Sequence, residues 1–148
     1  MRRRTDTESG FTLIELLFSI ATIAVIAGIG IPVYLSFSAR NDLDIAATTL
    51  AQSYWRARTL AAASDGDSPW GVAIGSGAVT LFKGASYATR DPSYDERYDL
   101  AGSVTASGVS SVVFTKFTGA PQTIGTTTFA NGSGARTLFI NAQGTVTY

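Results

Sequence analysis

The stretch that decides the fold is residues 10–39, GFTLIELLFSIATIAVIAGIGIPVYLSFSA, an apolar run with a single charged side chain, Glu15. From Leu16 to Ala39 the chain has 24 residues without a charge. At 1.5 Å per helical residue they reach roughly 36 Å, which exceeds the hydrocarbon core of a bilayer at about 30 Å. The sequence therefore predicts a helix that can span a membrane.

Glu15 makes this segment different from an ordinary anchor. A carboxylate at the centre of a membrane helix costs about 2.5–3.5 kcal/mol, and somewhat less near the end. Two interpretations are open: Glu15 lies wet at the interface, or it pairs with a cation inside an assembly. The segment is also too long for a secretory signal peptide and has no small-x-small cleavage pattern at its far end.

The run GFTLIE at residues 10–15 closely resembles the processing site of type IV prepilins and of the pseudopilins of type II secretion. In that family a membrane-embedded peptidase cuts after the glycine, and the new N-terminal residue is N-methylated. The resemblance implies cleavage between Gly10 and Phe11 and methylation of Phe11. Glu15 then becomes the fifth residue of the mature chain, where the family carries its characteristic glutamate.

Charge pairing gives this arrangement a physical purpose. Cleavage creates an α-amino cation at Phe11, and a neighbouring subunit shifted along the axis can bring its Glu15 to that amine. Opposite charges favour the ionised form of both groups in a low-dielectric bundle. The pair would set the register between subunits and would neutralise the carboxylate on assembly.

The chain divides into four parts around this segment. Residues 1–10 are expected to be a leader, headed by three arginines, that the prepilin peptidase removes. Residues 11–39 form the transmembrane and assembly half of a helix, residues 40–64 its amphipathic half, and residues 65–148 a β-sheet domain. Because basic residues that flank a span stay in the cytoplasm, the sheet domain is expected to face outward.

Gly28, Gly30 and Pro32 form the weakest part of the span. Glycine costs about 1 kcal/mol in a helix interior and proline about 3 kcal/mol, so we expect a kink or local melting there. Family members often carry proline at this position of the mature chain, and their helix is commonly unwound just before it in filaments. The resemblance implies a role in assembly, although glycine and proline are also simply common in membrane helices.

Beyond the span the helix is predicted to continue to Ser64, since no glycine or proline interrupts residues 33–64. Mostly apolar side chains recur there at spacings of three and four, which favours an amphipathic helix whose apolar face receives a sheet. They are Leu43, Ala46, Ala47, Leu50, Ala51, Tyr54, Arg58 and Ala61. Tyr54 and Trp55 are predicted to contact the core or the sheet.

Residues 64–69, SDGDSP, are predicted to stop the helix, and short β-type runs follow them. The fold class is therefore α+β: a long N-terminal helix packed on a C-terminal antiparallel β-sheet, the pilin fold. Hairpin turns are expected at residues 75–77 and 142–144. The predicted strands are Trp70 to Ile74, Ala78 to Phe82, Val112 to Phe117, Thr126 to Phe129, Arg136 to Asn141 and Thr145 to Tyr148.

Residues 87–100, YATRDPSYDERYDL, are too polar for a core and are expected to form a long surface loop. They hold the carboxylate cluster of Asp91, Asp95, Glu96 and Asp99, and some major pseudopilins bind calcium through such a loop. Two arginines are interleaved with these acids, and neither an Asp-x-Asp nor an EF-hand spacing is present. A solvated loop, or one that contacts other subunits, is the favoured interpretation.

A second resemblance concerns the globular part. The helix end LAQSYWRARTLAAAS followed by WGVAI resembles the H-type minor pseudopilins and related minor pilins, in which an Ala-Arg pair, here Ala57-Arg58, precedes the first strand. The terminal run LFINAQGTVTY is similar to theirs as well. The DNA-binding minor pilins of this branch carry arginines after the glycine of the last hairpin. Gly144 is followed here by Thr-Val-Thr-Tyr, so DNA is not expected as a partner.

Composition argues against catalysis. The 148 residues contain no histidine and no cysteine, so the usual general bases, thiol nucleophiles and soft-metal ligands are missing. A carboxylate dyad or a Ser/Lys pair stays open as a catalytic alternative. No cofactor or metal is expected. Charge is balanced at 11 basic and 11 acidic residues, which does not indicate a polyanion binder.

The predicted function is that of a structural subunit of a type IV pilus-like filament. The alternatives are a minor pseudopilin of a type II secretion system, a minor pilin that primes assembly, and a simple membrane-anchored binding module. The resemblance implies four kinds of partner: copies of itself and other pilin-like subunits, the prepilin peptidase and methyltransferase, an inner-membrane assembly platform, and lipid before assembly. The expected location is the inner membrane, as a single-pass protein with a cytoplasmic N-terminus, and then an extracellular pilus or a periplasmic pseudopilus.

Overall fold

The computed structural model describes residues 10–75 and 77–148, and for residues 30–32 it describes the backbone alone. The chain contains two compact units, one that ends at Ser36 and one that comprises Phe37–Tyr148. A single helix, α1 (Leu13–Ala62), contributes to both units. The helix predicted for residues 11–64 is therefore confirmed to within two residues at each end. The first nine residues of the predicted leader lie outside the described part of the chain.

The backbone of α1 is helical through Gly28, Gly30 and Pro32. The expected kink or melting does not interrupt the helix in the described backbone. One proline removes one main-chain hydrogen bond, and a helix of 50 residues is cooperative enough to continue past it. Local melting on assembly concerns a different state of the chain and stays a prediction.

The helix ends where the sequence predicts it. Ser64 takes a left-handed conformation with φ of 54°, and its amide donates to the carbonyl of Ala61 at 3.0 Å. A short 3₁₀ turn, η1 (Asp65–Asp67), follows. The indole of Trp70 donates to the carbonyl of Asp65 at 2.9 Å, so the first strand begins tied to the turn that ends the helix.

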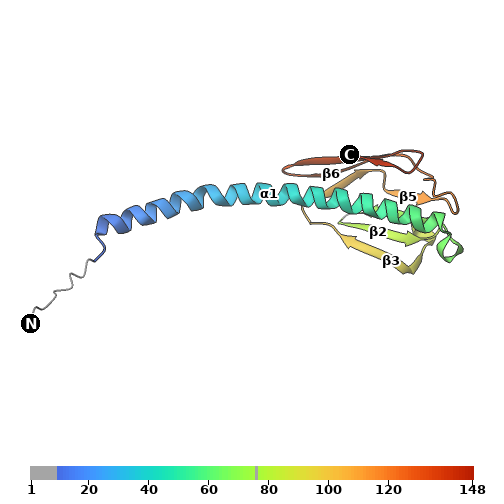
Figure 1. Ribbon diagram of the computed structural model, residues 1–148, viewed down its shortest axis with the longest axis horizontal. Helices are drawn as coiled ribbons and strands as arrows, with labels where there is room; N and C mark the ends of the chain where they lie inside the picture. Colours follow the sequence, from blue (N-terminus) through green and yellow to red (C-terminus); the bar gives the residue numbers. More distant parts are fainter. Residues whose placement is uncertain (1–9, 76) are drawn as a thin grey trace, which may run out of the picture. The chain divides into compact units, whose positions relative to one another are not determined.

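The strands form two antiparallel four-stranded sheets, and the α+β class is as predicted (Figure 1). The prediction of a single sheet is wrong, because the strands divide between two sheets. The first sheet has the order β3-β2-β1-β5 and contains β1 (Trp70–Gly75), β2 (Ala78–Lys83), β3 (Asp91–Asp99) and β5 (Ser111–Phe114). The second has the order β4-β6-β7-β8 and contains β4 (Thr105–Gly108), β6 (Gly125–Asn131), β7 (Gly134–Ile140) and β8 (Val146–Thr147).

Both predicted hairpins are present. Gly75 pairs with Ala78 at the β1–β2 turn, and Ile140 pairs with Val146 at the β7–β8 turn. All six predicted strands are found, with ends that differ from the prediction by at most three residues. The largest shift is at β5, which stops at Phe114 because the chain then turns into a loop in which Phe117 has φ of 69°.

The residues 87–100 do not form a loop throughout, and that prediction is wrong. They contain a 3₁₀ turn, η2 (Tyr87–Thr89), and the nine-residue strand β3, which pairs with β2. β3 lies at the edge of its sheet and most of its side chains are exposed, so it lacks the apolar alternation of a half-buried strand. β4 was missed for a similar reason, since it is short and mostly exposed.

The core lies between the C-terminal half of α1 (residues 37–62) and both sheets. The predicted helix face is confirmed, because Leu43, Ala46, Ala47, Leu50, Tyr54, Ala57 and Ala61 are buried. The strands, together with Val104 just before β4, add the other buried side chains of this cluster: Trp70, Val72, Ile74, Val79, Leu81, Val112, Phe114, Phe129, Leu138 and Ile140. Ala51 and Arg58, also predicted on this face, are half-buried.

Polar side chains also connect α1 to both sheets. The amide of Asn131 donates to the carbonyl of Ala39 at 2.6 Å. The guanidinium of Arg136 donates to the carboxylate of Asp44 at 2.6 Å, and that of Arg56 lies 2.5 Å from a carboxylate oxygen of Glu96. These contacts fix the helix against the second sheet near its middle and against β3 further on.

Trp55 is not a core residue, contrary to the prediction. Its side chain is 70% exposed, whereas that of Tyr54 is 2% exposed. Consecutive residues of a helix point about 100° apart, so the two side chains cannot both face a core that lies on one side of α1. The structure selects Tyr54, which meets Phe114 edge to face with ring centroids 6.1 Å apart.

The burial of Tyr54 leads to a prediction about alkaline stability. Burial raises the pKa of its hydroxyl from 10.0 to about 12, and only a polar contact with Thr127 opposes this. Between pH 10 and 12 the unfolded chain ionises at this residue while the folded chain does not, so the folded state loses on the order of 2–3 kcal/mol by pH 12 and about half of that by pH 11. Tyr54→Phe should remove this loss, measured as the difference between the two proteins in urea unfolding at pH 8 and pH 11. An identical pH dependence in both proteins would contradict it.

Candidate processing and assembly site

The start of α1 is defined by a side-chain cap. The hydroxyl of Thr12 accepts a hydrogen bond from the amide of Glu15 at 3.3 Å, and the carbonyl of Thr12 accepts one from the amide of Leu16 at 3.1 Å. Thr12 is thus the N-cap and Glu15 occupies the first turn. Threonine followed three residues later by glutamate is the signature of a capping box. This signature was not recognised from the sequence.

Gly10 and Phe11 precede this cap and lie outside the helix. A Cβ atom built on Gly10 would meet nothing within 4 Å, and the side chain of Phe11 is 85% exposed. The predicted scissile bond between them therefore lies outside secondary structure. No described residue of the chain packs against it at Gly10. Cleavage there would leave an α-amino group one residue before the N-cap.

The helix dipole acts in opposite directions on the two charges of this site. A helix N-terminus carries a partial positive charge that stabilises a carboxylate in the first turn and destabilises a cation placed beside it. Glu15 is therefore well placed, whereas an amine at Phe11 would gain from an anion outside its own helix.

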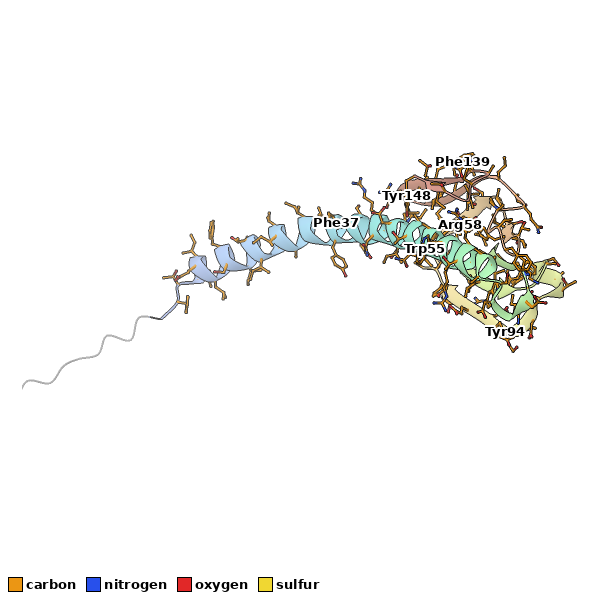
Figure 2. All side chains as sticks on the ribbon, turned by 45° about the vertical axis from the view of Figure 1, so that its right-hand side comes forward. Phe37, Trp55, Arg58, Tyr94, Phe139 and Tyr148 are labelled. Atoms are coloured by element: carbon orange, nitrogen blue, oxygen red, sulfur yellow. The ribbon has the colours of Figure 1, made fainter. Side chains whose placement is uncertain are left out.

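The N-terminal half of α1 (residues 13–36) presents apolar side chains on all sides (Figure 2). Its large apolar residues with described side chains are each more than half exposed, and the helix is long and apolar enough to cross a membrane. The hydroxyls of Ser19 and Thr22 donate to the carbonyls of Glu15 and Phe18 within the helix, at 2.7 and 2.8 Å. Glu15 is the only charged residue between positions 13 and 36.

A Cβ atom built on Gly28 would meet nothing within 4 Å in the described part of the chain. The small size of this residue is therefore not required by packing against the residues that the structure describes. Close approach of helices in membranes relies on small residues of this kind. For Gly30 and Pro32 the structure gives the helical backbone alone, so their predicted role in assembly stays a prediction.

Arg58, which the sequence singled out together with Ala57, connects two loops. A Cβ atom on Gly119 would lie 3.1 Å from its Cγ, and one on Gly144 would lie 3.2 Å from its Cδ. Both glycines have positive φ, 63° and 73°, so both loops need glycine for the conformation and for the space. Arg58 therefore lies against both the loop after β5 and the β7–β8 turn. Its neighbour Ala57 is fully buried in the core.

The acidic residues of β3 are engaged with nearby side chains. Arg90 pairs with Asp95 at 2.8 Å, Arg97 with Asp99 at 2.8 Å, and Arg56 with Glu96 at 2.5 Å. Asp91 accepts two hydrogen bonds from Ser93, which lower the pKa of that carboxyl. In the described ranges no three histidine, cysteine or acidic side chains gather in a way that could hold a metal ion.

Comparison of the chain with protein-family models, with curated proteins and with solved structures found no match.

Proposed function

We propose that this chain is the precursor of a structural subunit of a type IV pilus-like filament. The peptidase cuts it between Gly10 and Phe11, Phe11 is N-methylated, and the mature subunit polymerises through the N-terminal half of α1. The observation that carries the proposal is the cap at Thr12. Glu15, the single charge in the apolar N-terminal half of α1, lies in the first turn after this cap. The Gly10–Phe11 bond lies just outside the helix.

The apolar surface of residues 13–36 is covered first by the lipid bilayer and then by the filament. Before assembly, lipid covers residues 13–36, and Glu15 near the end of the span costs less than the 2.5–3.5 kcal/mol of a central carboxylate. On assembly, neighbouring helices replace lipid, and the amine of one subunit meets Glu15 of another. The low dielectric constant of the bundle strengthens this attraction, which offsets the desolvation of both groups.

The sheet domain supports a role on the surface of the filament. Its charged side chains, including the ion pairs of β3, lie at exposed or half-buried positions, so the domain can face water while α1 is covered. Three arginines at the head of the leader favour insertion with the N-terminus in the cytoplasm and the sheets outside. An assembly platform in the inner membrane would extract the processed subunit from the bilayer.

Mass spectrometry of the native N-terminus tests this proposal, on filaments sheared from cells and on washed membranes in parallel. The expected species begins with methylated Phe11. Its abundance in the sheared fraction identifies a major filament subunit, whereas low abundance confined to membranes identifies a minor pilin or pseudopilin. A chain that still begins at Met1 or Arg2 in both fractions would refute the proposal and leave an anchored module.

A further inference from the structure

Asn131 is the last residue of β6 and is followed by Gly132 in the turn to β7. Asn131 pairs with Gly134, so the turn consists of the two residues between them. The side chain of Asn131 folds back over this turn, because its Oδ1 accepts a hydrogen bond from the amide of Ser133 at 2.9 Å. An Asx turn of this kind holds the amide carbon, Cγ, close to the backbone nitrogen of the following residue.

The nitrogen of the same side chain connects the turn to α1. Nδ2 of Asn131 donates to the carbonyl of Ala39 at 2.6 Å. The amide group can accept at one end and donate at the other, whereas a carboxylate has acceptors only. An aspartate at position 131 would therefore place an oxygen against the carbonyl oxygen of Ala39 instead of a donor.

Gly132 leaves the side-chain amide of Asn131 open to attack by its backbone nitrogen. Glycine has no side chain to hinder ring closure, and a Cβ atom at this exposed residue would meet nothing within 4 Å. Among residues 10–75 and 77–148, no acceptor is hydrogen-bonded to the amide of Gly132. The hydrogen bond from Nδ2 to Ala39 opposes the reaction without preventing it, because the turn is exposed and can open locally.

We propose that Asn131 is a site of spontaneous deamidation and that its conversion releases the β6–β7 turn from α1. The nitrogen of Gly132 loses its proton to water and bonds to Cγ of Asn131. The Cγ–Nδ2 bond then breaks, and Nδ2 leaves as ammonia with a proton returned by water. Water opens the resulting succinimide at either of its carbonyls, which gives aspartate or isoaspartate.

Either product weakens the attachment of the turn and leaves the rest of the second sheet in place. Both lack the donor for Ala39, and isoaspartate also lengthens the main chain where the turn sets the register of β6 and β7. The ion pair of Arg136 with Asp44 at 2.6 Å and the buried side chain of Phe129 still hold the sheet on α1. The change is therefore confined to the turn.

Prolonged incubation of the full chain in detergent micelles at mildly alkaline pH tests the site, with peptide mass spectrometry as the readout. Asn131 should lose its amide and yield both aspartate and isoaspartate peptides. Asn141 is the matched control within the chain, because its Oδ1 accepts from the amide of Gln143 at 3.0 Å in the same kind of turn but alanine follows it. It should keep its amide. Equal conversion of the two asparagines, or no conversion of Asn131, would overturn the proposal.

Gly132→Ala tests the attacking nitrogen with little disturbance of the turn. The φ of Gly132 is not left-handed, and a Cβ atom there has room. Conversion of Asn131 should fall to the level of Asn141 in this variant. Undiminished conversion, or aspartate without isoaspartate in the unaltered chain, would exclude the succinimide route.

Asn131→Asp tests the release of the turn by hydrogen exchange. The amides of residues 130–135 should exchange about tenfold faster than in the unaltered chain, as expected when a hydrogen bond is lost. Asn141→Asp is the control and should exchange as before, because the side chain of Asn141 only accepts, from the amides of Gln143 and Thr145. Unchanged exchange in Asn131→Asp would refute the release. Neither measurement requires cleavage or assembly, so the results are independent of the proposed function.

Discussion

A chain in which alanine replaces Glu15 will be inserted and cleaved normally but will not enter filaments. The substitution leaves the amine of Phe11 in the neighbouring subunit as an unpaired charge among apolar side chains. Removing one partner of a buried ion pair costs about 3–5 kcal/mol, which lowers an association constant by about two to three orders of magnitude or more. Insertion into the membrane becomes easier, because the carboxylate no longer has to be accommodated.

Three further variants separate charge from size and from position in this test. Glu15→Gln keeps the size without the charge and should fail like alanine, while Glu15→Asp keeps the charge and should assemble in part. Ser19→Ala is the control one turn further on, because its hydroxyl is satisfied by the carbonyl of Glu15 in its own helix. Subunits are counted in the sheared fraction and their N-termini are read by mass spectrometry. Normal incorporation of Glu15→Ala would disprove the proposed pairing.

Replacing Gly10 by valine will abolish processing, and the protein will accumulate in the membrane as the uncut chain of 148 residues. A peptidase that cuts after glycine must approach the backbone closely, and a branched side chain at that position blocks the approach. A Cβ atom at Gly10 would meet nothing within 4 Å among residues 10–75 and 77–148, so the loss would report on the peptidase and not on the folded part of the chain.

Gly10→Ala provides the control for this prediction, since it adds a single methyl group and should be cut slowly rather than not at all. The measurement is the ratio of uncut to mature chain in membranes, from intact mass and N-terminal peptides. Since assembly needs the free amine of Phe11, Gly10→Val should also yield no filaments. Mature-size protein from Gly10→Val would show that the cleavage site lies elsewhere.

Much of the candidate site could be predicted from short stretches of sequence, because the interactions that form it act between neighbouring residues. The all-round apolar character of residues 16–39 needs no knowledge of the fold, and a threonine three residues before Glu15 is enough to cap the helix. The helix stop at residues 64–69 and the hairpin turns are equally local. The buried face of the C-terminal half could be predicted because a helix repeats every 3.6 residues wherever its partner lies.

Other features depend on partners that are distant in the chain. β3 is polar in sequence because both of its faces meet water, and it is a strand because β2 supplies its hydrogen bonds. Arg58 lies against Gly119 and Gly144, which belong to the loop that connects the two sheets and to the β7–β8 turn of the second sheet. Strand pairing of this kind has no signature within a single segment, so a polar edge strand reads as a loop.

The sequence by itself thus determined the long helix, its apolar N-terminal half, the single charge of that half and the residue types on which the proposed processing site rests. Periodicity, hydropathy and capping act between neighbours in the chain, which is why these features can be read without a structure. The tertiary structure alone decided that the strands form two sheets and that Tyr54 is buried while Trp55 is exposed. The physical reason is that both sheets pack on one side of α1, and only their positions determine which side of the helix remains free.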